Sequence, residues 1–326
     1  MSIGAEVIQE IIDGTYEVRQ RAVDARHAGD FLNSGLRKRL AQEQHPDLRI
    51  DEDAGFVKLD AAAFPQTAAV IEQGVELARQ VREKVAKTTA AKMRKKYKIL
   101  KPHSYEDPQI LHSPIFRLAL DPRLIATISA YLGYIPVLST ANFWYNPNSF
   151  IVRDEEIPAL SERARTLLSH LDWADNRLVK VFIHCLPVSG SCGPIVIMHP
   201  QDSDEVREKT NYRYANTRNT SSDPYHTNGL YLEDSLIRTH LGREPRTVPL
   251  VGDAGTVYIA DTSRCFHYGG RSTSTEQERL LGVLLYLRPG ALKLSTKYDA
   301  TPPFRHLSSA SLPLIDRLVL GEEIQS

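Results

Sequence analysis

The chain has 326 residues, 42% of them hydrophobic, a composition typical of a globular protein that buries a core of its own. Lysine plus arginine and aspartate plus glutamate number 40 each, so the formal net charge is zero. This balance argues against general nucleic-acid binding, which relies on excess positive charge. No stretch approaches the run of about 18 apolar residues that a membrane span needs, and the three cysteines are too few for a disulfide framework.

Two further features bear on location and redox state. Residues 1–10 do not combine a basic segment with an apolar one, so we expect no secretion signal. The sparse cysteines make a cytoplasmic protein the default expectation. Cys265 lies two residues before His267 and could be taken for a metal ligand. We expect a buried, inert thiol there, because free cysteine packs as a small hydrophobic residue.

Residues 1–135 are expected to be mostly helical. Within residues 66–98, a stretch rich in Ala, Val, Glu, Lys and Arg, apolar residues recur near helical spacing. The basic end of this stretch, residues 92–98, has two interpretations. It is either a solvated helix end, where cations meet the negative end of the helix dipole, or a patch for anions such as the phosphates of coenzyme A.

A further helix, expected over residues 118–132, has clear end signals. Asp121 and Pro122 suit the cap and the first helical position, and Gly133 suits the residue after the last turn. From Pro136 onward the composition becomes that of strands, with β-branched and aromatic residues between turn residues. We expect strands at 137–145, 177–184, 193–198, 252–261 and 280–287.

A long polar section, residues 200–250, interrupts this series of strands. An insertion of this length inside a compact domain is usually a lid or a binding loop, so we expect Gln201–Arg246 to set substrate choice. The alternative is a surface feature with no part in the site. Its Tyr212, Tyr214 and Arg218 offer flat faces and a cation, which suit a polar or carboxylate-bearing small molecule.

The most informative feature is a pair of segments about a hundred residues apart, His170-Leu-Asp172 and Asp261–His267. If the first segment is a strand, its His and Asp side chains leave the same face. A second imidazole, from His267 on a partner strand, would complete two imidazoles and one carboxylate. That set holds a divalent iron on one side and leaves its other positions open. A His-x-Asp pair alone is a weak signal, because it occurs by chance in many proteins.

Twelve residues after His267, Arg279 opens the apolar run 280–287. A buried arginine at the start of an apolar strand requires an anionic partner, and a guanidinium binds a carboxylate through two parallel hydrogen bonds. A metal triad together with such a clamp indicates an iron oxygenase that uses a 2-oxoacid as co-substrate. The order His-x-Asp, long gap, His, then Arg in an apolar strand is far more specific than the pair alone.

These segments, with VKVFIHCLPVSGSCGPIVIM and GDAGTVYIADTSRCFHYGGR, resemble the phytanoyl-CoA dioxygenase family of Fe(II)/2-oxoglutarate oxygenases over residues 115–290. The resemblance implies that His170, Asp172 and His267 are iron ligands. It also implies that Arg279 binds the distal carboxylate of 2-oxoglutarate. Iron halogenases similar to this group carry a small residue in place of the carboxylate, so the presence of Asp172 favours hydroxylation or a related oxidation.

The chain departs from the family pattern in three places. The segment 199–203 reads His-Pro-Gln-Asp-Ser, where members often carry a Pro-Gly-Ser-His turn. Phe182 stands where many members have Trp, and we expect it to lie against the co-substrate. Arg279 is one residue further from the second His than in some relatives. On the strand before the metal pair, Asn142 is the polar residue that we expect to reach 2-oxoglutarate.

Other polar residues near these motifs have simpler interpretations. His184 lies on the same face of the expected strand as Phe182 and Lys180, so its side chain could line the pocket. A hydrogen-bonded histidine of the core is the more common outcome. For Trp173, directly after the metal pair, packing is favoured. Arg271, four residues after His267, is expected to be a turn or surface charge rather than a second clamp.

The expected fold is α+β, with a double-stranded β-helix (jelly roll) core flanked by N-terminal helices. We expect one structural unit in three regions: a helical region at 1–135, a catalytic core at 136–300 that contains the 200–250 insertion, and a tail at 301–326. Shorter helices are expected at 230–241 and 312–320.

The expected function is oxidation of a C–H bond of a small molecule by Fe(II), 2-oxoglutarate and O2, with release of succinate and CO2. The cofactors carry that chemistry, while the protein supplies ligands, orientation and exclusion of water. The alternatives are desaturation or epoxidation, a jelly-roll enzyme of another kind, and a non-catalytic metal-binding or sensor protein. Neither nucleic-acid nor membrane partners are expected, and a homo-oligomer is left open.

Overall fold

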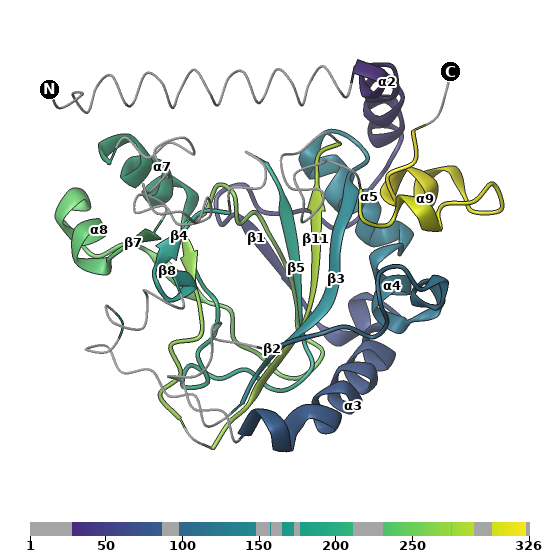
Figure 1. The fold of residues 1–326 in the computed structure, drawn as a ribbon. Coiled ribbons are helices and arrows are strands. Elements are labelled where there is room, and N and C mark those ends of the chain that lie inside the picture. Colours follow the sequence, from purple (N-terminus) through teal and green to yellow (C-terminus); the bar gives the residue numbers. More distant parts are fainter. Residues whose placement is uncertain are drawn as a thin grey trace, which may run out of the picture.

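The computed structural model describes residues 28–86, 98–147, 157, 165–172, 177–210, 231–274, 276–289 and 302–323. Two antiparallel sheets form its centre (Figure 1). Within the described residues, no helix is both long enough and apolar enough to cross a membrane.

The larger sheet has six strands in the order β1-β9-β5-β11-β3-β2. Their bounds are Phe56–Leu59 for β1, Val257–Ala260 for β9, Val179–His184 for β5, Arg279–Leu287 for β11, Val137–Asn146 for β3 and Lys98–Leu100 for β2. β5 and β11 are buried along nearly their whole length. Their near-continuous apolar sequence is typical of strands that are covered on both faces.

The smaller sheet has five short strands in the order β7-β4-β10-β6-β8. Their bounds are Tyr231–Leu232 for β7, Ser169–His170 for β4, His267–Tyr268 for β10, Val196–Met198 for β6 and Thr247–Pro249 for β8. The outer strand β8 ends in Pro249, a residue that sheets tolerate at their edges because it lacks a backbone N–H.

The path of the chain between the two sheets identifies the architecture. The strands β3, β4, β5 and β6 lie alternately in the larger and the smaller sheet. β8 lies beside β6 in the smaller sheet, and β9, β10 and β11 again alternate between the two sheets. The four inner strands of the larger sheet therefore face β4, β10, β6 and β8. This interleaved order is that of a double-stranded β-helix, so the predicted fold class is confirmed.

Helices cover the outer faces of both sheets (Figure 1). Their bounds are Ala28–Gln42 for α2, Thr67–Ala86 for α3, Pro114–Ala119 for α4, Pro122–Leu132 for α5, Pro200–Lys209 for α7, Asp234–Leu241 for α8 and Leu314–Val319 for α9. α3, α4 and α5 lie along the larger sheet, while α7 and α8 lie beside the smaller one. The helix predicted at 118–132 is confirmed as α5, with Asp121 as cap and Gly133 in the left-handed conformation.

Three buried apolar clusters hold these layers together. The largest lies between the six-stranded sheet and the helices, and it includes Phe116, Phe143 and Tyr286. A second, with Phe182 and Tyr258, lies inside the jelly roll. The third joins the smaller sheet to α7 and α8. Because the inner cluster fills only part of the barrel, polar side chains from both sheets share the remaining interior.

Two expectations for the chain path are corrected. The helical spacing noted within residues 66–98 corresponds to α3, but a helix end is not found at the last of these residues, because Lys98 opens β2 and pairs with β3. The insertion predicted at 200–250 is shorter at its C-terminal end, because Thr247–Pro249 is strand β8 of the jelly roll.

The described ends of the insertion are joined to each other by ion pairs. Asp202 on α7 is fully buried and binds the guanidinium groups of Arg243 and Arg246 at 2.8 and 2.6 Å. Tyr212, Tyr214 and Arg218 lie outside the described residues, as do Trp173 and most of the basic run at 92–98.

Candidate metal centre

His170 and His267 are direct cross-strand partners in the smaller sheet, on β4 and β10. Their side chains therefore leave the same face, and their ring centroids are 4.3 Å apart. The neighbouring residue Tyr268 leaves the opposite face of β10, as the alternation of a strand requires. The pair faces the interior of the jelly roll, where both histidines are buried.

Each imidazole is oriented by a hydrogen bond to a nearby backbone carbonyl. Nδ1 of His170 lies 2.9 Å from the carbonyl oxygen of Leu168, and Nδ1 of His267 lies 3.1 Å from that of Cys265. A carbonyl oxygen only accepts, so Nδ1 is the donor in both contacts and Nε2 is the nitrogen left to face a metal. This is the tautomer that a metal-binding histidine needs.

Asp172 completes the group directly after β4. Its carboxylate Oδ2 lies 3.6 Å from Nε2 of His267, and the potential ligand atoms of His170, Asp172 and His267 lie within 4.8 Å of one another. Thr262 holds both the backbone and the side chain of Asp172: its carbonyl oxygen accepts from the Asp172 N–H at 2.9 Å, and its hydroxyl donates to Oδ2.

The charge of Asp172 is stabilised by its surroundings. Burial by itself would raise the pKa of this carboxyl group. The ammonium of Lys180 and the two imidazoles outweigh burial and hold the pKa well below the usual range. Asp172 is therefore ionised at neutral pH, which is the form that binds a metal.

The residues present fit a divalent transition metal. Two imidazole nitrogens and one carboxylate oxygen converge from one side, and both imidazoles are held in the binding tautomer. This donor set, with positions left for further ligands, suits Fe(II), although imidazole and carboxylate also accept other divalent metals. The three residues singled out in the sequence are thus brought together by the fold.

Arg279 lies at the first position of β11 and is 1% exposed. Its guanidinium donates to the side-chain oxygen of Asn146 at 2.9 and 3.3 Å and to the carbonyl oxygen of Gly193. Gly193 has φ +70°, and a Cβ there would lie 2.9 Å from the backbone of Gly270. Only glycine allows this approach, so the arginine is held between two closely packed loops.

The inner face of the larger sheet connects Arg279 with the metal centre. Lys180, Phe182 and His184 alternate on β5 and point inward, as their shared parity predicted; Phe182 and His184 lie opposite Val283 and Leu281 of β11. Trp144 on β3 packs against Phe182, with ring centroids 6.2 Å apart.

Two inward polar groups have atoms without hydrogen-bond partners in the part of the chain that is described. They are Nδ1 of His184 and the side-chain oxygen of Asn142, both buried. Burial lowers the pKa of His184 to about 4, and the positive charges of Arg279 and Lys58 act in the same direction. Unsatisfied buried polar atoms are costly, so this interior is suited to a polar ligand.

Sequence reasoning missed the residues that position Asp172. Thr262 belonged to a quoted motif without a role, and Lys180 was noted only for its strand parity. Asp261, which shapes the approach to His267, was missed as well. Its carboxylate accepts from the backbone N–H groups of Ser263 and Arg264, both at 2.9 Å, and from the hydroxyl of Tyr131 at 2.8 Å. It thereby shapes the turn that leads into His267. A run of Asp, Thr and Ser before a candidate ligand is the signal that could have indicated this turn.

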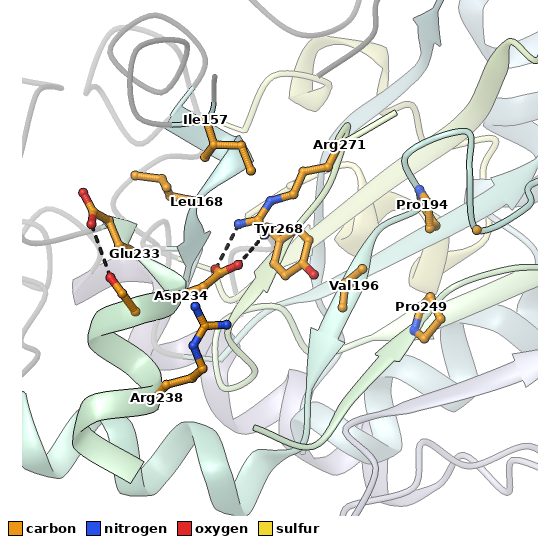
Figure 2. A pocket seen from close by; sticks show the side chains of 12 residues that line it. Ile157, Leu168, Pro194, Val196, Glu233, Asp234, Arg238, Pro249, Tyr268 and Arg271 are labelled. Carbon is orange, nitrogen blue, oxygen red and sulfur yellow. Dashed lines mark hydrogen bonds and ion pairs between the residues drawn. The ribbon is translucent and has the colours of Figure 1, made fainter. Parts of the chain in front are cut away.

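A hollow of about 650 Å³ lies on the other side of the smaller sheet. Figure 2 shows its lining, with Arg271 extended between Asp234 and the ring of Tyr268. The two arginine nitrogens lie 2.5 and 3.0 Å from the carboxylate oxygens of Asp234, and the guanidinium lies 3.6 Å from the ring centroid. The side chain of Arg271 is 13% exposed. It is therefore a largely buried side chain that links the loop after β10 to α8 rather than a surface charge.

No family model and no curated protein matches the chain. Among solved structures, it is similar to EctD from S. alaskensis with 2-oxoglutarate and 5-hydroxyectoine, at 16% identity and a TM-score of 0.47 over 76% of this chain and 81% of that one. It is also similar to the epimerase SnoN in complex with Fe3+, alpha-ketoglutarate and nogalamycin RO, at 14% identity and a TM-score of 0.44 over 77% and 83%. A third is the non-heme alpha-ketoglutarate-dependent carbocyclase SnoK, at 13% identity and a TM-score of 0.44 over 73% and 81%. The fold assignment rests on the strand order of the chain itself.

Proposed function

We propose that this protein is an Fe(II)- and 2-oxoglutarate-dependent oxygenase that oxidises a C–H bond of a small molecule. One observation carries the proposal: the interior of the jelly roll holds the His170, Asp172 and His267 group and, on the facing sheet, the buried guanidinium of Arg279. A purely structural metal site has no need of a buried arginine on the opposite sheet.

In this proposal the three residues hold Fe(II). The bound iron would supply the positions at which 2-oxoglutarate and O2 react, with release of succinate and CO2. Arg279 binds the distal carboxylate of 2-oxoglutarate, because its fork of N–H groups matches the two oxygens of a carboxylate. On binding, the charged oxygens of the ligand replace part of its contacts with Asn146 and Gly193.

Asn142 and Phe182 contribute to the co-substrate site. Asn142 has a buried side-chain oxygen without a partner among the described residues, and an ordered water at a bound ligand would satisfy it. Phe182 presents a flat apolar wall on the inner face of β5. It excludes bulk water from the path between the metal centre and Arg279, which strengthens the charge interactions there.

Hydroxylation, desaturation and epoxidation all begin with the same protein parts, and the ionised carboxylate of Asp172 favours these over halogenation. The substrate class is a small molecule. Part of the insertion, Gln201–Arg246, is proposed to form the lid that sets substrate choice; its two described ends are joined to each other through Asp202.

The proposal is tested by incubating the full chain with Fe(II), 2-oxoglutarate and O2 and measuring succinate. We expect succinate that requires all three, formed slowly even without the true substrate. The metal-binding alternative without catalysis predicts Fe(II) binding but no succinate above a metal-only control. Equal turnover with another 2-oxoacid would contradict the assignment of 2-oxoglutarate.

A further inference from the structure

Lys180 extends from β5 of the larger sheet across the interior to the metal centre on the smaller sheet. Its side chain is 11% exposed, and its ammonium forms an ion pair with Oδ2 of Asp172. The ammonium also lies 5.6 Å from the ring centroid of Trp144. A lysine buried to this degree is rare unless its charge is paired, and Asp172 supplies that pairing.

The oxygen that Lys180 binds is the one placed to bind a metal. Oδ2 of Asp172 faces Nε2 of His267 at 3.6 Å, and it also accepts from the hydroxyl of Thr262. The ammonium of Lys180 is therefore a cation that already binds the carboxylate of Asp172 in the metal-free protein. A divalent metal that binds Asp172 must compete with it, since two positive charges a few ångströms apart repel strongly in a poorly solvated interior.

Once a metal holds Asp172, the ammonium needs a new anionic partner. Among the described residues, Lys180 has no carboxylate within ion-pair distance other than Asp172. The co-substrate would bring one carboxylate to the metal and a second to Arg279. Lys180 lies opposite Leu285 on β11, whereas Arg279 is the first residue of that strand. The interior of the jelly roll thus receives one cation from each end of the larger sheet's central strands.

We propose that Lys180 makes metal binding dependent on the 2-oxoacid. In the protein without ligands, Lys180 occupies the carboxylate of Asp172. When metal and 2-oxoglutarate enter together, the ammonium moves to the carboxylate that the 2-oxoacid places at the metal. This inference rests on the proposed function, and it adds an order of assembly: metal alone binds weakly, and each ligand strengthens the binding of the other by the same factor.

The test measures the affinity of the full chain for Mn(II), a redox-stable probe, with and without saturating 2-oxoglutarate. For the original protein we expect 2-oxoglutarate to tighten Mn(II) binding by about 100-fold, within the usual range of coupling. For Lys180→Met we expect Mn(II) alone to bind about 10-fold more tightly than to the original protein, with the tightening by 2-oxoglutarate reduced to about 10-fold or less. Lys58→Met, which removes a cation of the same sheet that has no contact with Asp172, is the matched control.

Two further measurements separate this role from a structural one. Lys180→Arg keeps the charge and should retain most of the coupling, which also covers the case in which Lys180→Met does not fold. In thermal unfolding, Lys180→Met should lower the midpoint of the metal-free protein and lose this deficit when Mn(II) is bound. A residue that only supports the fold would lower both midpoints alike.

Equal coupling in the original protein and in Lys180→Met, or weaker binding of Mn(II) alone by Lys180→Met, overturns the inference while leaving the metal site intact. A lack of Mn(II) binding by the original protein, with and without 2-oxoglutarate, overturns the proposed function and the inference with it. Coupling that is unchanged in Lys58→Met but reduced in Lys180→Met supports it.

Discussion

The two faces of the smaller sheet differ in how they use charge. On the inner face, His170 and His267 bring two imidazoles next to one carboxylate. On the outer face, one residue further along β10, Tyr268 borders a hollow of about 650 Å³ in which Arg271 is paired with Asp234 (Figure 2). The hollow and the candidate metal centre therefore lie on opposite faces of the smaller sheet.

The comparison extends to two arginines of the same segment, Arg271 and Arg279. Arg271 has a carboxylate partner within the chain, and its ion pair joins the start of α8 to the loop after β10. Arg279 donates to the neutral oxygens of Asn146 and Gly193. The pairing of Arg271 with a carboxylate of its own chain indicates a structural role, whereas Arg279 is proposed to bind the carboxylate of a ligand.

The largest expected effect is a loss of activity on substitution of residues on the inner face of the smaller sheet, compared with an adjacent residue on its outer face. His267→Ala and Asp172→Ala should each reduce Fe(II)-dependent succinate formation by more than about 100-fold, because changes even to residues behind a metal ligand cost 10–100-fold. Tyr268→Leu, on the outer face, should retain activity within a few-fold. Circular dichroism should show that each variant remains folded. Full activity in Asp172→Ala would remove this residue from the metal centre.

The second prediction separates the two arginines. Arg279→Leu should raise the 2-oxoglutarate concentration required for half-maximal turnover, since loss of the two-bond contact costs about 2–5 kcal/mol. Arg271→Leu should leave that concentration unchanged. Titration of succinate formation against 2-oxoglutarate measures both. An equal rise in the two variants would mean that the effect comes from the stability of the loop rather than from a carboxylate contact.

The third prediction concerns the dependence of stability on pH. The pKa of His184 is lowered to about 4 from 6.5 in the folded protein, so between these values the unfolded chain binds a proton that the folded chain does not. The free energy of unfolding therefore keeps its full value above pH 6.5. It falls by about 2–3 kcal/mol as the pH falls toward 4, because protons bind His184 in the unfolded chain first. Urea unfolding of His184→Gln should show a shallower loss over this window than the original protein. His240→Gln on α8 is the control, and parallel curves for His184→Gln and the original protein would contradict the prediction.

The smallest expected effect tests the structural role of the outer face. Asp234→Ala should lower the free energy of unfolding by about 1–2 kcal/mol, because the carboxylate is partly exposed while its arginine partner is largely buried. The 2-oxoglutarate requirement should not change. Urea unfolding and succinate titration measure the two quantities, and a change in the second without the first would place this ion pair in the active site.

The amino-acid sequence by itself determined the local elements and the residues that carry chemistry. The strand composition of 137–145 and the apolar runs at 177–184 and 280–287 predicted β3, β5 and β11, because β-branched and aromatic residues suit buried strands. His170, Asp172, His267 and Arg279 were identifiable because each stands out from an apolar or turn-rich surrounding.

Only the tertiary structure decided how these residues meet. The strand β4 has two residues and β10 has two, too short for any pattern to reveal their register, yet that register places His170 beside His267. The contacts of Asp172 with Lys180 and Thr262 join three segments of the chain, two of which belong to different sheets. Contacts between segments distant in the sequence depend on how the sheets close over each other. A local sequence pattern predicts on which face of a strand a side chain lies, whereas the packing of the two sheets determines which residues that side chain contacts.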